Sequence, residues 1–176
     1  MKTIPEEAPP PPEEPPPPRY SKELTAHEDR FEYLLRIEAD TSDKWELRID
    51  KPDSKIWLST GSELNETVPM VRAILNFTTF ATPNDLYNIL YDVEFRKQWD
   101  KASVVDYEEF DRPSADVVLY YMHNKAPWPF QDRDFVEKRC IKRLPNNDIE
   151  IVSFHITDER YPPKAKMERG ETIVGG

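Results

Sequence analysis

The sequence predicts an α+β protein, in which one long helix and a pair of short helices are segregated from a mainly antiparallel sheet. Two observations lead to this class. Segments of alternating apolar and polar residues follow one another without helices between them, separated by turn residues. Apolar residues at helical spacing are confined to residues 21–39 and 83–98. Sequential strands favour antiparallel pairing, and helices segregated from the strands indicate the α+β class.

The chain begins with a segment whose composition excludes a packed core. Nine of its 18 prolines lie within residues 1–18, which contain no aromatic residue. Because proline has no backbone N–H, we expect residues 1–20 to form a disordered tail rich in proline and glutamate. This tail lacks the apolar segment of a signal peptide. Residues 21–176 then form one domain of ordinary size.

The first part of this domain combines a helix with three strands. Residues 21–39 have an amphipathic helical pattern, with Ser21 as the N-cap. Trp45, Leu47 and Ile49 alternate with charged residues, which predicts a half-buried strand. A turn at 51–55 leads to a second strand at 55–60, and a long third strand is expected at 68–80.

Two short helices and four strands are expected after this point. Thr82 is placed to cap a helix that begins with Pro83, and helical spacing continues to residue 98. Trp99, which follows, is expected in the core. Strands are predicted at 103–110, 116–123, 133–144 and 148–156, with turns at 111–116 and 144–147. Residues 168–174 are predicted to begin a further strand.

Charge and residue types exclude several classes of function. The net charge of −10 argues against a nucleic-acid partner, because such a surface needs a basic stripe. The three histidines lie on separate elements and Cys140 is the single cysteine, so no metal site or other cofactor is expected. No nucleophile or phosphate-binding motif is present, so we expect no catalytic residue and no enzyme activity. A single cysteine and the lack of a long apolar stretch fit a cytoplasmic protein.

Three motifs occur in a fixed order along the chain. They are FRKQWD at 95–100, PWPFQDRDFV at 127–136 and YPPKAKMERGE at 161–171. In this order and spacing they resemble the START domain family of lipid-transfer modules, and the resemblance covers residues 21–176. Each motif alone is weak, but three in register are fairly specific.

The resemblance implies a helix-grip fold, in which a curved antiparallel sheet surrounds a deep cavity and a C-terminal helix closes it. It implies binding of one lipid or sterol, carried or sensed between membranes, without catalysis. Phospholipid, sterol and ceramide all fit such a cavity. Family members continue beyond the point where this chain stops, so we expect the lid helix to be absent from this chain and the domain to be truncated at its C-terminus.

The strand at 133–144 holds the first candidate binding residues. Lysines on one face predict that this face meets solvent, which places Phe135, Glu137 and Arg139 inward with Ile141. An inward Arg139 needs a partner, and Glu137 is two residues away on the same face. In sterol-binding members that this chain resembles, an arginine at this position lines the cavity. Two hypotheses remain: a buried Glu137–Arg139 pair that holds a lipid head group, or two charges that reach water at the rim.

Other candidates lie on neighbouring strands and on one loop. Tyr121 lies on a strand that is apolar on both sides, and Ser153 and His155 share one face of the last long strand. They are expected either to bind a head group or to serve only as sheet residues. Pro127 and Pro129 fix the backbone around Trp128 at the cavity entrance that the resemblance implies. Trp128 is expected either to enter a membrane transiently or to pack down as a lid anchor.

The tail supplies an alternative function. Residues 17–20, Pro-Pro-Arg-Tyr, match the P-P-x-Y ligand of WW domains, with Pro17, Pro18 and Tyr20 as the contact residues. The preceding prolines favour the extended conformation that such domains bind. The alternative to lipid transfer is therefore a protein-interaction scaffold that uses this motif.

Overall fold

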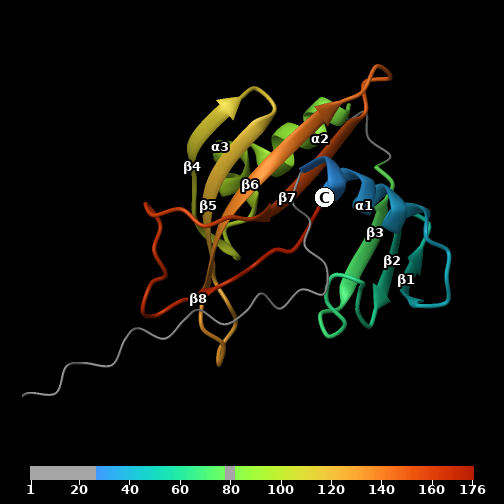
Figure 1. Cartoon of the computed structure of the whole chain (residues 1–176), viewed down its shortest axis with the longest axis horizontal. Coiled ribbons are helices and arrows are strands. Elements are labelled where there is room, and N and C mark those ends of the chain that lie inside the picture. The colour runs from blue at the N-terminus through green and yellow to red at the C-terminus, as the bar shows by residue number, and fades with distance from the viewer. Residues whose placement is uncertain (1–26, 78–81) are drawn as a thin grey trace, which may run out of the picture.

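The computed structural model describes residues 27–77 and 82–176 (Figure 1). The predictions for the tail, the Ser21 cap and the P-P-x-Y motif lie outside these residues. The described part confirms the α+β class and the predicted order of elements. It divides the strands into two sheets, one with the order β1-β2-β3 and one with the order β4-β5-β6-β7.

The first helix, α1 (His27–Ala39), is joined to the three-stranded sheet by Arg72 and by Tyr33, whose hydroxyl donates to Met70 Sδ at 3.4 Å. This sheet consists of β1 (Trp45–Lys51), β2 (Ser54–Ser59) and β3 (Met70–Leu75). Arg72 donates from Nη1 to the carbonyl oxygens of Ile37 at 3.1 Å and Asp40 at 2.6 Å. These carbonyls lie in the last turn of α1 and directly after it, so Arg72 caps the C-terminus of this helix. Its guanidinium also stacks on the ring of Trp45 at 4.5 Å.

The third strand is shorter than the sequence predicts. It ends at Leu75, which pairs with Ser54, the first residue of β2. The ladder stops there because the partner strand stops, and residues 76–77 continue without pairing as a strand. The prediction of a half-buried first strand is also wrong in part. Leu47 and Ile49 are exposed, because α1 contacts this sheet at Met70 and Arg72 of β3, on the edge opposite β1.

The second sheet has four long antiparallel strands. They are β4 (Val104–Ser114), β5 (Val117–Asn124), β6 (Arg133–Arg143) and β7 (Ile149–His155). A short strand, β8 (Glu168–Arg169), runs parallel to the start of β6. Strand β4 extends into the predicted turn at 111–116, because Ser114 still pairs with Val117. The hairpin at 144–147 is confirmed, with Asn147 at a φ of 70°.

Both short helices are confirmed, as α2 (Pro83–Tyr91) and α3 (Val93–Trp99). The Thr82 hydroxyl accepts a hydrogen bond from the N–H of Asp85 at 3.2 Å, and the Asp85 carboxylate accepts one from the N–H of Thr82 at 2.8 Å. The prediction for Trp99 is wrong: its side chain is 52% exposed. Its indole N–H donates to the carbonyl of Ile89 at 2.9 Å, so the ring is held on the outside of α2 rather than beneath the sheet.

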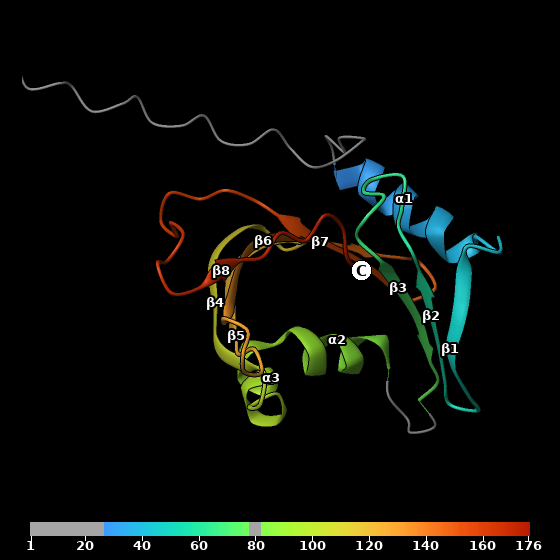
Figure 2. The ribbon, with the colours of Figure 1, turned by 90° about the horizontal axis from the view of Figure 1, so that it is seen from below.

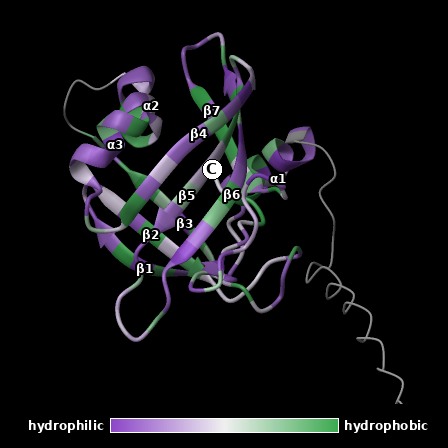
Figure 3. Cartoon of the chain, turned by 90° about the vertical axis from the view of Figure 1, so that its left-hand side faces the viewer, coloured by the Kyte–Doolittle hydropathy of each residue, from purple (hydrophilic) through white to green (hydrophobic). Residues whose placement is uncertain are grey.

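The four-stranded part of the second sheet has one side toward α1 and the other toward α2 (Figure 2). On the α1 side, Phe31 packs on Cys140, Val152 and Phe154. On the α2 side, the ring of Tyr91 lies over Arg139 at 4.1 Å. Hydrophobic and hydrophilic residues alternate along the strands and helices, as Figure 3 shows. The side of the second sheet that packs on Phe31 is called the α1 side, and the side that Tyr91 covers is called the α2 side.

The expected solvent face of β6 is wrong, and α1 packs on this face at Cys140. Val136 is fully buried and Cys140 is 2% exposed, although both lie on the face that also carries lysines. Burial raises the pKa of the Cys140 thiol. Lys142 stays exposed and pairs with Glu150 at 3.1 Å. The lysine pattern therefore did not mark a solvated face, because long lysine side chains reach water from beside a covered strand.

Candidate functional site

A buried arginine is the centre of the candidate site. Arg139 is 1% exposed and lies on the α2 side of β6. Its Nη1 donates to the hydroxyl of Tyr107 at 3.0 Å. The rings of Tyr91 and Tyr120 lie at 4.1 Å and 4.3 Å from its guanidinium carbon. The cation is thus held by aromatic rings and one neutral hydroxyl.

Glu137 is also buried, at 4% exposure, but it is not the partner of Arg139. One carboxylate oxygen accepts a hydrogen bond from the Tyr120 hydroxyl and the other accepts one from the Thr172 hydroxyl. Among the described residues, no ion pair joins Glu137 to Arg139. The hypothesis that Glu137 and Arg139 are both buried agrees with the structure. The prediction that they form a direct ion pair with each other is wrong. Tyr120 lies between the two charges, since its hydroxyl meets Glu137 and its ring meets Arg139.

Tyr107 and Tyr120 remain neutral at physiological pH. Burial raises the pKa of Tyr107, against the opposing effect of Arg139. Burial, and then the nearby Glu137 charge, raise the pKa of Tyr120 well above its ordinary value. Neither phenol therefore supplies a negative charge to Arg139.

Three further predicted residues lie on the same side of the sheet. In the antiparallel register, Ser153 pairs with Arg139 and His155 pairs with Glu137. The Nδ1 atom of His155 is buried without a hydrogen-bond partner among the described residues. Burial lowers the pKa of His155. Phe135 lies two residues before Glu137, with its ring against the backbone of Gly170, where a Cβ atom would come within 2.2 Å of the ring.

Tyr121 is not part of this cluster. It pairs with Val136, so its side chain points to the opposite side of the sheet from Glu137 and Arg139. There its hydroxyl accepts a hydrogen bond from Lys164 Nζ at 2.8 Å, and its ring stacks on Tyr161 at 5.0 Å. The prediction that places Tyr121 with the inward residues is therefore wrong, because adjacent residues of a strand point to opposite sides.

The sequence interpretation missed four residues that complete the cluster, namely Tyr91, Tyr107, Tyr120 and Thr172. The strand register places Tyr107 and Tyr120 on the α2 side, because Tyr120 pairs with Glu137 and Tyr107 pairs with Met122, two residues after Tyr120. That register depends on bulges in β4, which residue patterns do not reveal. Tyr91 and Thr172 come from a helix and a terminal segment, and no local pattern connects them to β6.

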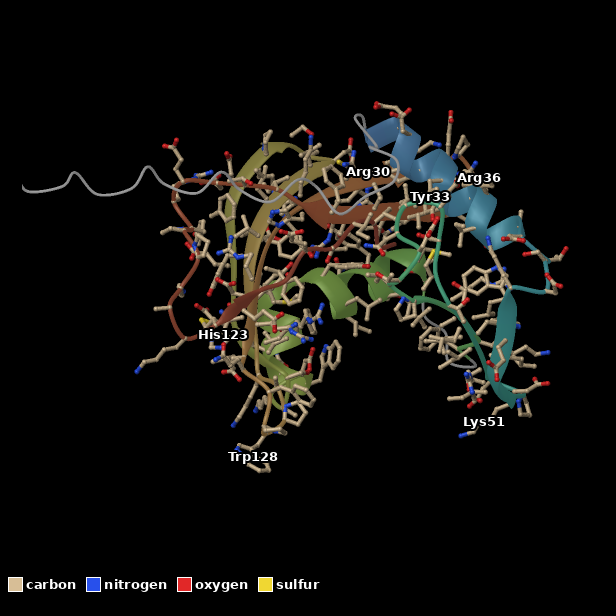
Figure 4. All side chains as sticks on the ribbon, turned by 60° about the horizontal axis from the view of Figure 1, so that its bottom comes forward. Arg30, Tyr33, Arg36, Lys51, His123 and Trp128 are labelled. Atoms are coloured by element: carbon tan, nitrogen blue, oxygen red, sulfur yellow. The ribbon has the colours of Figure 1, made fainter. Side chains whose placement is uncertain are left out.

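The predicted entrance loop projects from the end of the sheet (Figure 4). It carries Pro127, Trp128 and Pro129, and Trp128 is 92% exposed. Asp132 closes the base of the loop, where its carboxylate accepts from the Ala126 N–H at 3.0 Å and meets His123 Nε2 at 3.0 Å. The Ala126 N–H, and then His123, lower the pKa of Asp132. The large exposure of Trp128 argues against the lid-anchor alternative.

A buried ion pair connects two of the sequence motifs. Asp134 is fully buried, and Arg169 donates to its two oxygens from Nε at 2.8 Å and from Nη2 at 3.0 Å. Arg169 also donates to the carbonyl of Tyr161 at 3.0 Å. The Arg-Asp-Phe segment is thereby joined to the Arg-Gly-Glu segment across the β6–β8 pair.

Several exposed apolar residues lie outside this cluster, on β3, α2 and α3. They are Val71, Leu75, Ile89, Leu90, Phe95 and Trp99; Ile74 is also exposed, but alternation along β3 places it on the same side as Arg72, which contacts α1. A separate surface hollow of about 540 Å³ is lined by Tyr33, Arg36, Lys44 and Glu63, among others. It lies at the α1 end of the molecule and contains none of the predicted site residues.

Comparison with known proteins gives a consistent result. The family model described as START domain matches residues 30–176. START domain-containing protein 10 of Mus musculus is 23% identical over 142 residues, which are 81% of this chain and 47% of that protein. StAR-related lipid transfer protein 7, mitochondrial, of Mus musculus is 30% identical over 135 residues, which are 74% of this chain and 34% of that protein. The chain thus spans half or less of the length of these curated relatives.

The fold has solved counterparts as well. The structure of human StAR-related lipid transfer protein 5 superposes with a TM-score of 0.70 at 18% identity. The match covers 82% of this chain and 67% of that chain. At this identity the likeness establishes the fold, including the helix-grip arrangement, and nothing about the ligand.

Proposed function

The chain belongs to the START domain family, and from this premise we propose that it binds one lipid or sterol molecule on the α2 side of its sheet and carries or senses it between membranes. Two of the matched relatives are named as lipid transfer proteins. The proposed lipid-binding domain covers residues 21–176, with residues 1–20 as a tail.

The observation that carries the proposal is a cluster of buried polar side chains on the α2 side of the second sheet. Arg139, Ser153 and His155 share this side with Phe135, and Arg139 Nε and His155 Nδ1 are buried without a hydrogen-bond partner among the described residues. An apolar site with a few convergent polar groups is the usual design of a small-molecule site. The proposed ligand residues are therefore Arg139, Glu137, Phe135, Ser153 and His155, with Tyr107 and Tyr120 added.

The proposed activity is transfer rather than catalysis, as the names of the relatives indicate at the level of the family. We propose brief membrane contact through Trp128, and a cytoplasmic location. One relative is named as mitochondrial, so the location needs its own test by imaging of a tagged chain. No helix within residues 27–77 and 82–176 is long and apolar enough to cross a membrane.

The deciding experiment measures bound lipid directly. The chain is purified, extracted with organic solvent and examined by mass spectrometry for a lipid present at about one molecule per chain. Transfer of labelled lipid between donor and acceptor vesicles is measured in parallel. Repeated absence of a bound lipid, together with no transfer, would contradict the proposed function.

A second function is supported by residues 17–20 alone. The P-P-x-Y motif is proposed to bind a WW domain, so that the chain serves as a scaffold. Tyr20→Ala is expected to abolish binding to a panel of WW domains in a pull-down assay. Arg19→Ala, at the variable position, is the matched control and is expected to bind normally. Equal binding by the two variants would show that WW domains do not recognise Tyr20, and it would contradict the proposed role of the motif.

A further inference from the structure

The loop between β5 and β6 is closed at its base by the side chain of Asp132. Its Oδ1 atom accepts a hydrogen bond from the Ala126 N–H at 3.0 Å, and its Oδ2 atom meets His123 Nε2 at 3.0 Å. Asp132 therefore connects the first part of the loop with the end of β5. His123 lies at the base of this loop and Trp128 at its tip (Figure 4).

His123 faces carboxylates from three neighbouring segments. In the antiparallel registers it pairs with Asp106 of β4 and with Asp134 of β6, and Asp132 meets it from the loop. Residues that pair across adjacent antiparallel strands lie on the same side of the sheet. Asp134 already has a counter-charge in Arg169. In the described part of the chain, the ion-pairing partner of Asp132 is His123.

The cations near His123 have other contacts. Lys164 donates to the Tyr121 hydroxyl at 2.8 Å and interacts through space with the carboxylates of β4 and β6. Lys125 is exposed in the loop and acts on the charge of Asp132 through space. Neither lysine forms a direct ion pair with Asp132 among the described residues. Protonation of His123 thus places a positive charge in direct contact with this carboxylate.

The charge of His123 determines how firmly Asp132 is held. Histidine is the side chain whose charge ordinarily changes between about pH 5 and pH 8. Asp132 stays ionised over this range, because the Ala126 N–H, and then His123, lower its pKa. A protonated ring forms a charge-assisted hydrogen bond with the carboxylate, whereas a neutral ring forms an ordinary one. Charge-assisted hydrogen bonds are shorter and stronger, so the contact is tighter at acidic pH.

We propose that His123 and Asp132 form a proton-sensitive latch on the loop that carries Trp128. When His123 is protonated, the latch holds Ala126 and Asp132 together against the end of β5. When His123 is neutral, the latch weakens and the base of the loop opens more often. An anionic membrane surface attracts protons through its negative potential, which favours the latched state on contact. This consequence rests on the proposed function, whereas the latch itself does not.

The test follows the amide of Ala126, which is the donor to Asp132. Its hydrogen exchange is measured by NMR on the purified chain at a series of pH values through the histidine range. Each rate is divided into the intrinsic exchange rate at that pH, which gives a protection factor. The ring signals of His123 are titrated in parallel. We expect the protection factor to fall at least threefold as the pH rises through the titration of His123.

Variants connect this pH dependence to the two side chains. His123→Gln keeps a hydrogen-bond donor but no charge, and is expected to show the weaker protection at every pH. Asp132→Asn keeps an acceptor for the Ala126 N–H but removes the negative charge, and is expected to flatten the profile as well. His27→Gln is the matched control, because His27 begins α1, a separate element. This control is expected to retain the pH dependence of the native chain.

The outcomes separate the latch from the proposed function. A pH-dependent protection factor in the native chain and in His27→Gln, lost in His123→Gln, supports the latch. A flat profile in the native chain, or a fall that persists in His123→Gln, overturns it. Transfer of labelled lipid between vesicles is measured for the same proteins. Absence of transfer in all of them, with pH-dependent protection intact, contradicts the proposed function and leaves the latch standing.

Discussion

At the scale of single residues, the charged groups of β6 show how neighbouring positions acquire different roles. Asp134 is fully buried and paired with Arg169, whereas Arg133 is half exposed and paired with Glu168. Both pairs connect β6 to β8, yet only one is removed from water. A buried pair is expensive to break because the remaining charge stays buried, while an exposed pair contributes little.

Asp134→Ala is therefore expected to lower the free energy of unfolding by about 3 to 5 kcal/mol, since it leaves Arg169 without its counter-charge. Arg133→Ala is the matched control, expected to change it by less than about 1 kcal/mol. Urea denaturation followed by circular dichroism measures both. A similar loss in the two variants would contradict the distinction between the pairs.

His155 predicts a pH dependence of stability. Its folded-state pKa is lowered by burial, so the folded protein favours the neutral ring. The stability that this group supplies is complete above its ordinary pKa of 6.5 and is lost as the pH falls through the lower folded-state value. We expect the free energy of unfolding to decrease on acidification below about pH 6.5, and His155→Gln to flatten this decrease. A variant with an unchanged pH profile would show that His155 does not contribute.

At the scale of elements, the loop between β5 and β6 is closed at its base and exposed at its tip. Asp132 fixes the base through the Ala126 N–H and His123, independently of the aromatic residues at the tip. Trp128 is 92% exposed and Phe130 is 65% exposed. Exposed aromatic residues on an anchored loop suit the interface of a membrane.

Trp128→Ala is expected to slow lipid transfer between vesicles several-fold while changing the free energy of unfolding by less than about 0.5 kcal/mol, because the side chain loses no packing. Val105→Ala is the control, since Val105 is 56% exposed on β4 and belongs neither to the loop nor to the exposed apolar residues of β3, α2 and α3. Transfer assays and thermal unfolding are compared for both. A drop in stability for Trp128→Ala would mean that the ring packs on the protein, and unchanged transfer would exclude it from membrane contact.

At the scale of the whole molecule, the two sheets are covered unequally. The α1 side of the second sheet is buried against Phe31, whereas β3, α2 and α3 leave large apolar side chains in water. Exposed apolar groups in one region of a protein indicate a surface that receives a ligand or partner. This distribution agrees with the proposed lipid binding, in which the ligand would cover the exposed apolar side chains.

Paired substitutions on β3 test this distribution. Val71 is 67% exposed and Leu75 is 54% exposed, so Val71→Thr with Leu75→Thr is expected to leave the free energy of unfolding within about 1 kcal/mol while lowering lipid retention. Val118→Thr is the contrasting control, because Val118 is fully buried and its loss should destabilise the fold. Strong destabilisation by the β3 substitutions would show that these residues belong to the core.

Much of the fold could be predicted, because its signals are local. Helical spacing and the Thr82–Pro83 start located α2, and alternation located the four long strands within a few residues. The predictions failed where burial depends on another element. Lys138 and Lys142 suggested a solvent face for β6, but Val136 and Cys140 on that face are buried, and α1 packs on Cys140. Trp99 was expected in the core, but its side chain is exposed in the described part of the chain.

The sequence by itself determined the α+β class, the order of the elements, the family and the shared face of Arg139 and Glu137, but not whether these two charges reach water. These follow from periodicity, turn residues and spaced motifs, which are properties of neighbouring positions. Only the tertiary structure decided the partners of those two charges. Tyr107, Tyr120, Tyr91 and Thr172 come from four separate segments, and strand register together with helix docking brings them to Arg139 and Glu137. No local pattern encodes that register, because it is set by bulges and by packing between distant parts of the chain.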